Sequence, residues 1–493
     1  MALVTAPALP DFADQARRYP VVPVWTDLAG AASPVDLFQR IGAGQGAVLL
    51  ERSGHDQGRY AVIGLDPVTT LVARGGVVTW TDGPIDGVEP GASLVETLRA
   101  VTAARRSPAI PDTPVTAGAI GVLGGDALRP PPATGAPPDS PPEAVLTFPG
   151  TMVVCDPDRG RLRLVVHVPV SPERPAEDLY AGARQRLRAL VDRLGPVDQP
   201  GPEPVAAPGP APVEMTSDIP DPQFQPMIEA AHRRVRAGEV RQVNISRRFF
   251  APAADPLAVY RTLRASNPAP YLFLLRLPGV TLVGASPQSL IQVRDGEVHT
   301  YVIAGTRPRG ADPQADAALA AELREDPKER AEHAMLVELA IADLTPVARP
   351  GSVTVKDRER LVRYSRVMHL TSEVTGALAQ GRTAVDALAA VFPPGGITGV
   401  PRAAALRVID EIEPVPRGLY GGAIGYLGFA GDLDLCLGIR TLQFPDGSGS
   451  AYVQAAAGVV ADSVPELEVA ESRAKASALV AALAQAARAR EPA

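Results

Sequence analysis

Cysteine is almost absent from the 493-residue sequence, which contains only Cys155 and Cys436. Both lie in apolar stretches far apart in the chain, so we expect neither a disulfide framework nor a thiolate metal site. Long apolar runs are absent as well, and no stretch reaches the roughly 18 residues that a membrane span needs. Residues 1–20 lack a basic segment followed by an apolar core, so they do not resemble a secretory leader. These absences predict a cytoplasmic protein without membrane contact.

Lysine is also scarce, because only Lys328, Lys356 and Lys475 are lysines among 48 basic residues. The formal net charge is −7 and no basic stripe runs along the chain, so nucleic acid is not an expected partner. A hydrophobic content of 46% provides material for a large buried core, and the length suits two to four domains.

Acidic residues at helical spacing are the first positive signal. Asp326 followed by Pro327 marks the start of a helix, because proline is favoured just inside a helix N-terminus. Glu329, Glu332 and His333 then share one face of that helix.

A second acidic helix is predicted over residues 464–485, where Glu468, Glu471 and Lys475 follow one another at i, i+3 and i+7. Two pairs of carboxylates on two helices suit a hard divalent cation such as Mg²⁺, which takes oxygen ligands. Spacing alone leaves a second interpretation open, namely two solvated charged faces.

The predicted fold class is α+β, with antiparallel sheets packed together and helices outside, because strands follow one another without strict β-α-β units. Residues 37–170 predict short strands, among them 46–50, 60–64 and 161–168. Further along, the pattern predicts helices at 223–238, 315–323, 328–342, 385–392 and 403–412, and strands at 240–250, 271–275, 281–284, 298–301, 422–429 and 451–460.

Two segments, 129–143 and 195–212, are rich in proline and small residues and are predicted to be loops. We therefore predict three parts: an N-terminal lobe over residues 1–195, a connector over 196–220 and a catalytic lobe over 221–493.

Six blocks occur in an order that is typical of one family. They are VIAGTRPRG (302–310), ERAEH (329–333), YSRVMH (364–369), GGITGVPR (395–402), YGGAIGY (420–426) and GIRT (438–441). Through these blocks the chain resembles the chorismate-utilising enzymes, most of all the large subunit of anthranilate synthase and next the large subunit of aminodeoxychorismate synthase. The resemblance is dense over 221–487 and thin over 36–170.

The resemblance implies a Mg²⁺ shell, partly direct and partly through water, of Glu329, Glu332, Glu468 and Glu471. It implies that Tyr420 and Arg440 anchor the enolpyruvyl carboxylate of chorismate, since an arginine fork stays charged in a desolvated site. His369 is expected near the ring, in proton removal or pyruvate elimination. The other residues expected to bind substrate are Gln242, Ala304, Gly305, Thr306, Gly396, Ala456, Gly458 and Lys475.

The absence of lysine at two positions bears on which nucleophile attacks chorismate. Salicylate and isochorismate synthases resemble this chain but have a lysine base where it has Gln242, and aminodeoxychorismate synthases typically have a lysine nucleophile where it has Ala304. The pair resembles the anthranilate synthase pattern, in which ammonia attacks C2 of chorismate directly. Neither Cys155 nor Cys436 has the glycine neighbours of a nucleophile elbow. The resemblance therefore implies a separate glutamine amidotransferase as the source of ammonia.

Several positions depart from the family pattern. Where this chain has Gln288, the family has a glutamate that serves as the acid for the departing C4 hydroxyl. Loss of a general acid lowers the rate about 10²- to 10⁴-fold. Gly396 replaces a threonine or serine, Ala456 replaces a glycine, and AIAD (340–343) replaces Gly-Arg-Asn-Asp. A slow but ordinary enzyme, altered chemistry on chorismate or a related ring, and a non-catalytic binding subunit all stay open. Aminodeoxychorismate synthesis is the alternative amination, weakly favoured by ITG (397–399) and QVN (242–244).

A regulatory pocket is expected from LLE (49–51) and GRY (58–60), which resemble the segment where tryptophan binds in feedback-controlled relatives. Its predicted residues are Glu51, Arg52, Pro270 and Tyr271. The family usually has serine at the position of Arg52, and a bulky cation there would compete with the amino group of tryptophan. We therefore expect weak feedback inhibition, with an inconsequential surface arginine as the alternative.

Overall fold

The structure is a computed structural model that describes residues 3–30, 32–42, 44–54, 58–89, 93–129, 142–197, 215–363 and 367–488. Three predicted segments lie wholly or mostly outside these ranges: the loop at 129–143, the connector at 196–220, and the YSR part (364–366) of the YSRVMH block. Among the described residues, no helix is both long enough and apolar enough to cross a membrane.

The first part of the chain contains α1 (Leu9–Ala16), β1 (Val21–Ala29), α2 (Pro34–Ile41), β2 (Val48–Gly54), β3 (Gly58–Arg74), β4 (Val77–Trp80), α3 (Leu94–Ala104), β5 (Gly118–Leu123), β6 (Ala144–Asp156), β7 (Arg161–Pro169) and α4 (Ala176–Leu194). Next come β8 (Thr216–Ser217), α5 (Asp221–Arg236), β9 (Gln242–Pro252), α6 (Pro256–Ser266), β10 (Tyr271–Leu277), β11 (Val280–Ser286), β12 (Ser289–Arg294) and β13 (Glu297–Pro308).

The remaining elements are α7 (Pro313–Glu325), α8 (Pro327–Leu344), β14 (Thr354–Arg363), β15 (Val367–Ala377), α9 (Ala384–Val391), α10 (Gly395–Thr398), β16 (Gly399–Val400), α11 (Arg402–Ile412), β17 (Ala423–Gly428), β18 (Leu433–Leu437), β19 (Thr441–Pro445), β20 (Ser450–Val459) and α12 (Pro465–Arg488). The predicted helices and strands of the second half are present, with bounds that differ by a few residues.

The described strands pair antiparallel throughout. Two pairings join the first and second halves of the chain, since β2 pairs with β10 and β5 pairs with β17. The antiparallel α+β prediction is thus confirmed. The division into lobes at residues 195 and 221 stays a prediction.

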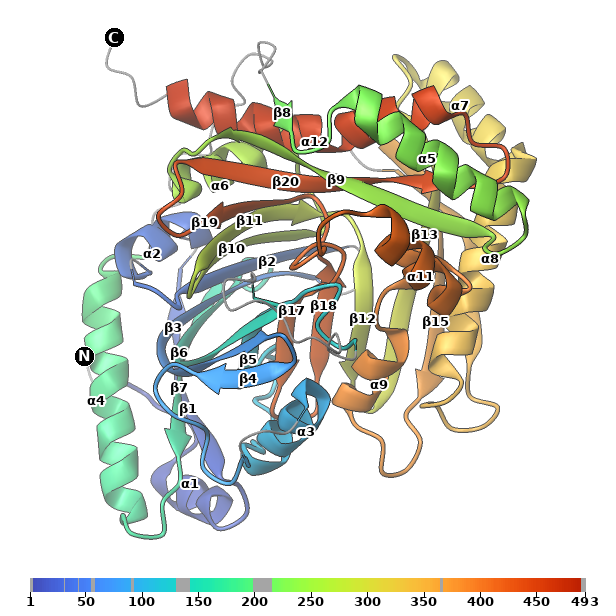
Figure 1. Ribbon diagram of the computed structural model, residues 1–493. Helices are drawn as coiled ribbons and strands as arrows, with labels where there is room; N and C mark the ends of the chain where they lie inside the picture. The colour runs from blue at the N-terminus through green and yellow to red at the C-terminus, as the bar shows by residue number, and fades with distance from the viewer. Residues whose placement is uncertain are drawn as a thin grey trace.

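Helices lie on the outside of the sheet, and two of them matter most for the site. Figure 1 shows α12 along β20 and α8 beside β13 and β15. The side-chain carboxylate of Asp326 accepts hydrogen bonds from the backbone N–H groups of Lys328 and Glu329, as an N-cap does. The predicted start of the first acidic helix is therefore confirmed.

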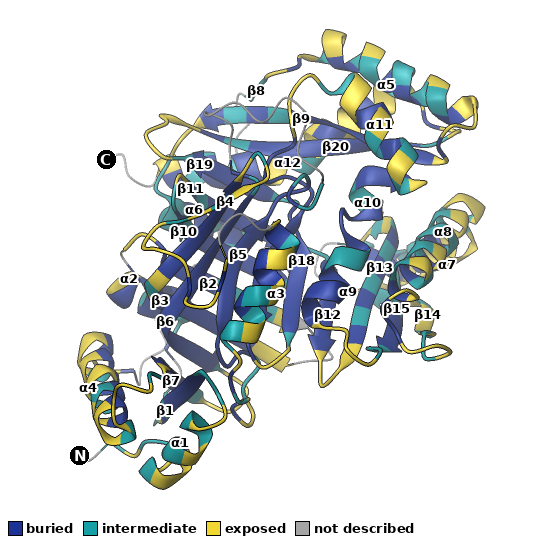
Figure 2. Ribbon diagram, turned by 60° about the horizontal axis from the view of Figure 1, so that its bottom comes forward, coloured by how far each residue is buried: buried dark blue, intermediate teal, exposed yellow. Residues whose placement is uncertain are grey.

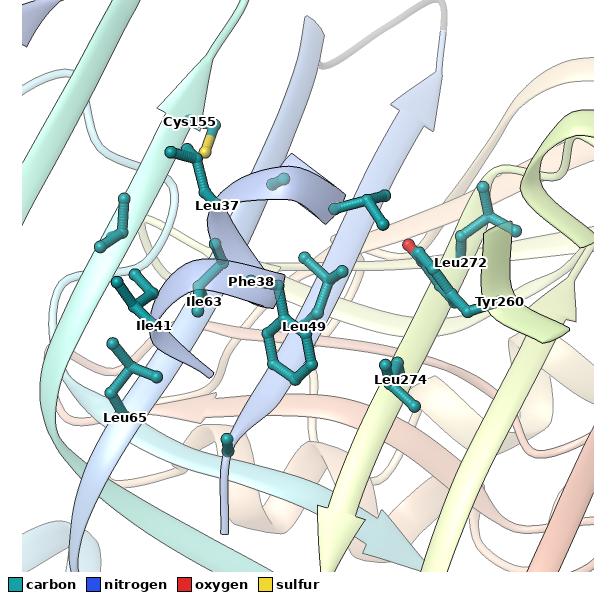
Figure 3. Close-up of a cluster of buried hydrophobic side chains, with 14 of the residues drawn as sticks. Leu37, Phe38, Ile41, Leu49, Ile63, Leu65, Cys155, Tyr260, Leu272 and Leu274 are labelled. Carbon is teal, nitrogen blue, oxygen red and sulfur yellow. The ribbon is translucent and has the colours of Figure 1, made fainter. Parts of the chain in front are cut away.

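The hydrophobic core lies between the sheet and these helices. In Figure 2 most strands are largely buried, with β14 as an exception, whereas α4, α5 and α7 turn exposed residues outward. Figure 3 shows how one cluster combines distant segments: Phe38 of α2, Leu49 of β2, Tyr260 of α6 and Leu274 of β10 meet in it. The first and second parts of the chain share this core.

Helices α2 and α3 were not predicted, since only short strands were expected from the pattern of residues 37–170. In α3, Leu94, Leu98 and Val101 are buried at helical spacing, and Ser93 and Glu96 form a capping box. The sequence contains this capping box and this helical spacing, but the surrounding strand-like runs led to a strand prediction for the whole region. Helices α4 and α6 were also not predicted.

Truncation of Leu49 to alanine should lower the free energy of unfolding by about 2–5 kcal/mol, because this fully buried side chain lies on the strand that pairs with β10. Denaturant unfolding would measure the loss. Val77→Ala on β4 is the control, since Val77 is 63% exposed and its truncation should change stability by less than about 0.5 kcal/mol. Equal effects of both variants would contradict the burial described here.

Candidate active site

A cavity of about 420 Å³ lies where α8, α12, β9, β13 and β20 meet. Every residue predicted to act in catalysis, to bind substrate or to bind metal lines this one cavity: Gln242, Gln288, Ala304, Gly305, Thr306, Glu329, Glu332, His369, Gly396, Tyr420, Arg440, Ala456, Gly458, Glu468, Glu471 and Lys475. The structure brings them together, and their individual roles stay predictions.

The wall formed by α8 carries two half-buried carboxylates, Glu329 and Glu332. Arg307 Nη1 donates to Glu329 Oε1 at 2.9 Å. Burial raises the pKa of Glu332, and the neighbouring charge of Glu329 adds to that rise. His333, predicted on the same face, does not line the cavity, because it is buried with its Nε2 2.7 Å from Ser372 Oγ.

The wall formed by α12 carries Glu468 and Glu471. Ser463 Oγ donates to Glu468 Oε1 at 2.7 Å, whereas Glu468 Oε2 is buried without a hydrogen-bond partner. Burial raises the pKa of Glu468, and the Glu471 charge adds to it. Lys475 Nζ lies 2.7 Å from Glu471 Oε1 and also donates to the Ala456 carbonyl oxygen at 3.0 Å.

The donor set of the two helices fits a divalent cation in its chemistry. Within the described ranges, no group of three or more His, Cys, Asp or Glu side chains is arranged to hold a metal ion by itself. The four glutamates instead reach the cavity from two sides, where their charges repel and one buried oxygen lacks a donor. Substrate oxygens and water would have to complete the shell, as is usual for Mg²⁺.

Positive charge and hydrogen-bond donors lie on another part of the lining. Arg440 adopts a left-handed backbone conformation with φ of 52°, which is uncommon for a residue other than glycine. Burial lowers the pKa of Arg440, and it raises the pKa of Tyr420 to about 12, so the tyrosine remains a donor. An arginine fork beside a phenol suits a carboxylate.

His369, on β15, is held by two residues of β13. Its Nδ1 lies 3.1 Å from the Gly305 carbonyl oxygen and 3.0 Å from Thr306 Oγ1. The carbonyl can only accept, which assigns the proton to Nδ1 and the lone pair to Nε2. Burial lowers the pKa of His369, so the ring is neutral near pH 7.

Strands β9 and β20 form the floor of the cavity. Gln242 and Asn244 alternate along β9, and the side-chain Oε1 of Gln242 is buried without a partner. A Cβ at Gly458 would lie 3.3 Å from Asn244 Oδ1, so glycine leaves room between these strands. The face of β9 that carries Gln242 and Asn244 therefore lines the cavity.

Two of the divergent positions, Gln288 and Gly396, line the cavity together. Gln288 and Gly396 also line a side pocket of about 60 Å³, together with Ala340 and Asp343 of α8. A Cβ at Gly396 would meet no atom within 4 Å, so the missing threonine or serine side chain leaves open space beside Gln288. Three of the family departures, at Gln288, Gly396 and 340–343, thus meet at this side pocket, whereas Ala456 lies outside it.

Sequence reasoning missed several lining residues, among them Pro287, Ile303, Lys328, Ile397, Ile439, Gln454, Ala455 and Val460. Gln454 was detectable, because it alternates with Ala456 and Gly458 on β20. The apolar members carried no chemical signal in the sequence.

A larger cavity, of about 570 Å³, lies elsewhere and holds none of the predicted site residues. Some of its arginines are paired with its own aspartates, as in the contacts of Arg59 with Asp158 and of Arg161 with Asp156. The smaller cavity is the better candidate, because it is lined by every residue predicted to act in catalysis or to bind substrate or metal.

The predicted regulatory residues Glu51, Arg52 and Tyr271 line a space of only about 20 Å³. The Arg52 guanidinium carbon lies 4.0 Å from the Tyr271 ring centroid, and its Nε is 3.4 Å from Asp434 Oδ2. The Arg52 side chain is 10% exposed, which excludes the alternative of an inconsequential surface residue. Pro270 does not line this space, although its carbonyl oxygen accepts from the Ser53 N–H at 2.9 Å.

Asp434 is the centre of this small site. It accepts hydrogen bonds from Tyr60 at 3.0 Å, from Tyr271 at 2.7 Å and from Gln292 at 3.2 Å. The arginine therefore fills the space and neutralises a carboxylate that already has three donors. The remaining space has room for about one water molecule and is too small for an indole ring.

Comparisons with known proteins identify the family of the chain. The sequence pattern of the family described as chorismate binding enzyme matches residues 46–481. Anthranilate synthase component 1 of Geobacillus stearothermophilus is 38% identical, covering 97% of this chain and 96% of the relative. The component 1 protein of Mycolicibacterium smegmatis is 36% identical, covering 100% and 96%. The chain therefore belongs to the chorismate-binding enzyme family.

Two solved structures support the fold. Anthranilate synthase component I from Streptococcus pneumoniae superposes with a TM-score of 0.73 at 32% identity, covering 92% of this chain and 99% of that one. The menaquinone-specific isochorismate synthase from Escherichia coli has a TM-score of 0.67 at 19% identity, covering 97% and 99%, and shows the fold alone.

Free tryptophan should bind the unaltered protein weakly or not at all, because Arg52 fills the pocket and neutralises the carboxylate of Asp434. Arg52→Ser should create binding that isothermal titration calorimetry detects. Arg59→Ser is the control, since Arg59 is exposed and paired with Asp158 outside this space. Micromolar binding by the unaltered protein would show that Arg52 moves aside and that this description is wrong.

Proposed function

We propose that the chain aminates chorismate in the manner of anthranilate synthase component 1. Chorismate and ammonia would give 2-amino-2-deoxyisochorismate, followed by anthranilate and pyruvate when the side chain is eliminated. The observation that carries the proposal is the single cavity, in which four carboxylates for a cation lie in the same lining as an arginine and a tyrosine for a substrate carboxylate.

Nitrogen would enter as free ammonia rather than through a lysine of the protein. The only lysines that line the cavity within the described residues are Lys328 and Lys475. Gln242 and Ala304, at the positions of the lysines of related enzymes, cannot form a covalent adduct with the ring. We propose that a separate glutamine amidotransferase subunit supplies the ammonia.

A Mg²⁺ ion held by Glu329, Glu332, Glu468 and Glu471 would supply positive charge for the ring carboxylate. The protein's own residues would do the rest: Arg440 and Tyr420 would bind the second carboxylate and so orient the ring. The neutral His369 would accept a proton at Nε2, since its Nδ1 is engaged with the Gly305 carbonyl. We assign the protein to the Mg²⁺-dependent lyases on this basis.

Glu332→Gln or Glu468→Gln should raise the Mg²⁺ concentration needed for half-maximal activity about 10- to 100-fold, because each removes a charged oxygen from the cation site. Magnesium titrations of chorismate turnover would measure the shift. Glu338→Gln is the matched control on the same helix, because Glu338 is exposed and lies outside the cavity. Unchanged magnesium dependence in both site variants would remove these helices from the proposed site.

Product analysis with chorismate, Mg²⁺ and excess ammonium at high pH tests the function itself, because ammonium bypasses the partner. We expect a slow aminated product from the unaltered protein, since the Gln288 amide hydrogen-bonds but delivers no proton. Gln288→Glu should raise the rate by one or more orders of magnitude, up to the limit of about 10² to 10⁴ set by general-acid catalysis.

Other outcomes of this comparison are equally informative. A lower rate in Gln288→Glu would mean that the corner of Gln288 and Gly396 is adapted to another substrate, because the variant adds an unpaired charge there. Two inert proteins that still bind a glutaminase would favour the non-catalytic subunit.

A further inference from the structure

Two arginines, Arg247 and Arg417, lie buried behind the cavity walls and do not line the cavity itself. Arg247 is 1% exposed and Arg417 is 7% exposed. A buried guanidinium is costly unless its N–H groups find acceptors, so such a residue is held in one place by what it bonds. The acceptors of these two arginines therefore show which parts of the site each one holds.

Arg247, on β9, holds the beginning of α12. Its Nη2 donates to the Val469 carbonyl oxygen at 3.1 Å and to Ser472 Oγ at 3.0 Å. These two residues directly follow Glu468 and Glu471 in the sequence. The guanidinium thus fixes the turn of helix that carries both carboxylates of this wall.

Further contacts hold the Arg247 guanidinium in place against α12. Its Nη1 donates to Asp221 Oδ1 at 2.7 Å and to the Ile219 carbonyl oxygen at 3.0 Å. Its guanidinium carbon lies 4.3 Å from the Phe224 ring centroid and 4.8 Å from that of Phe249. The start of α12 is therefore tied to both β9 and α5 through one side chain.

Arg417 holds a different wall. Its Nε and Nη2 donate to the two carboxylate oxygens of Glu413 at 2.9 and 2.7 Å, a bidentate pair whose side chains are 7% and 4% exposed. Its Nη1 donates to the Ile397 carbonyl oxygen at 2.9 Å, and its Nη2 also donates to the Asn244 carbonyl oxygen. Its guanidinium carbon lies 5.9 Å from the Tyr420 ring centroid. Asn244, Ile397 and Tyr420 all line the cavity.

The two guanidinium groups share no acceptor: that of Arg247 bonds to α5, its flanking residue and α12, and that of Arg417 bonds to β9, α10 and Glu413. The two networks meet on β9, because Glu413 also accepts from the N–H and the Oγ of Ser246, the residue before Arg247. We propose that Arg247 positions the cation-binding carboxylates of α12, that Arg417 positions the wall that receives the substrate, and that each acts mainly on its own wall. The proposal rests on the proposed function, and neither arginine touches substrate.

Lysine substitutions separate the two roles, because lysine keeps the charge but cannot reproduce the fork of a guanidinium. Arg247→Lys should weaken Mn²⁺ binding, followed by electron paramagnetic resonance without substrate, about 10- to 100-fold. Its KM for chorismate at saturating Mg²⁺ should stay close to that of the unaltered protein. Arg417→Lys should leave Mn²⁺ binding unchanged and raise the KM for chorismate by up to about 100-fold. Each variant is thus the control for the other.

Milder variants cover the case in which a lysine variant does not fold. Ser472→Ala removes one acceptor of Arg247 and Glu413→Gln weakens the pair of Arg417, so each should reproduce a smaller shift in the same constant. Parallel changes of both constants in every variant, or a lower melting temperature with neither constant changed, would overturn the proposal and leave a structural role only. Failure of the proposed function can be told apart from failure of this proposal, because the unaltered protein would then neither bind nor convert chorismate. In that case the claim for Arg417 falls with it, and Mn²⁺ binding alone decides the claim for Arg247.

Discussion

Mutual repulsion among buried carboxylates is the constraint on which the rest of this structure depends. Glu332 and Glu468 face one cavity with raised pKa values, caused first by burial and then by neighbouring glutamates. Like charges move apart unless the surrounding framework holds them in place, and when they are held together their pKa values rise. Here the framework is an antiparallel sheet with a helix on each side of the cavity, and each helix is fixed by capping or by a buried arginine.

The same sheet connects the candidate site with the small space around Arg52. β12 begins one residue after Gln288, and β18 ends three residues before Arg440. Gln292 and Asp434, on these two strands, belong to the network that Arg52 completes. The arginine thus supplies, from within the chain, a cation for Asp434, and this contact joins β2 to β18.

The divergent residues form a pattern when placed in space. Gln288 and Gly396 are far apart in sequence but line the same corner and the same side pocket, whereas the carboxylates and the arginine and tyrosine elsewhere in the lining follow the family. These two departures therefore lie in the region expected to receive the departing hydroxyl, whereas Ala456 lines the cavity outside the side pocket. The family and the full-length relatives are the reason for favouring an enzyme over a binding subunit.

Helical spacing in the sequence determined the two acidic helices, and alternation determined which face of β9 carries Gln242 and Asn244, because both signals are periodic along one element. Motif order determined the family. Only the tertiary structure decided that Arg52 is enclosed, that Gln288 and Gly396 share a corner, and that Arg247 and Arg417 hold different walls. These facts depend on contacts between residues tens to hundreds of positions apart, and no local pattern in a single sequence records such contacts.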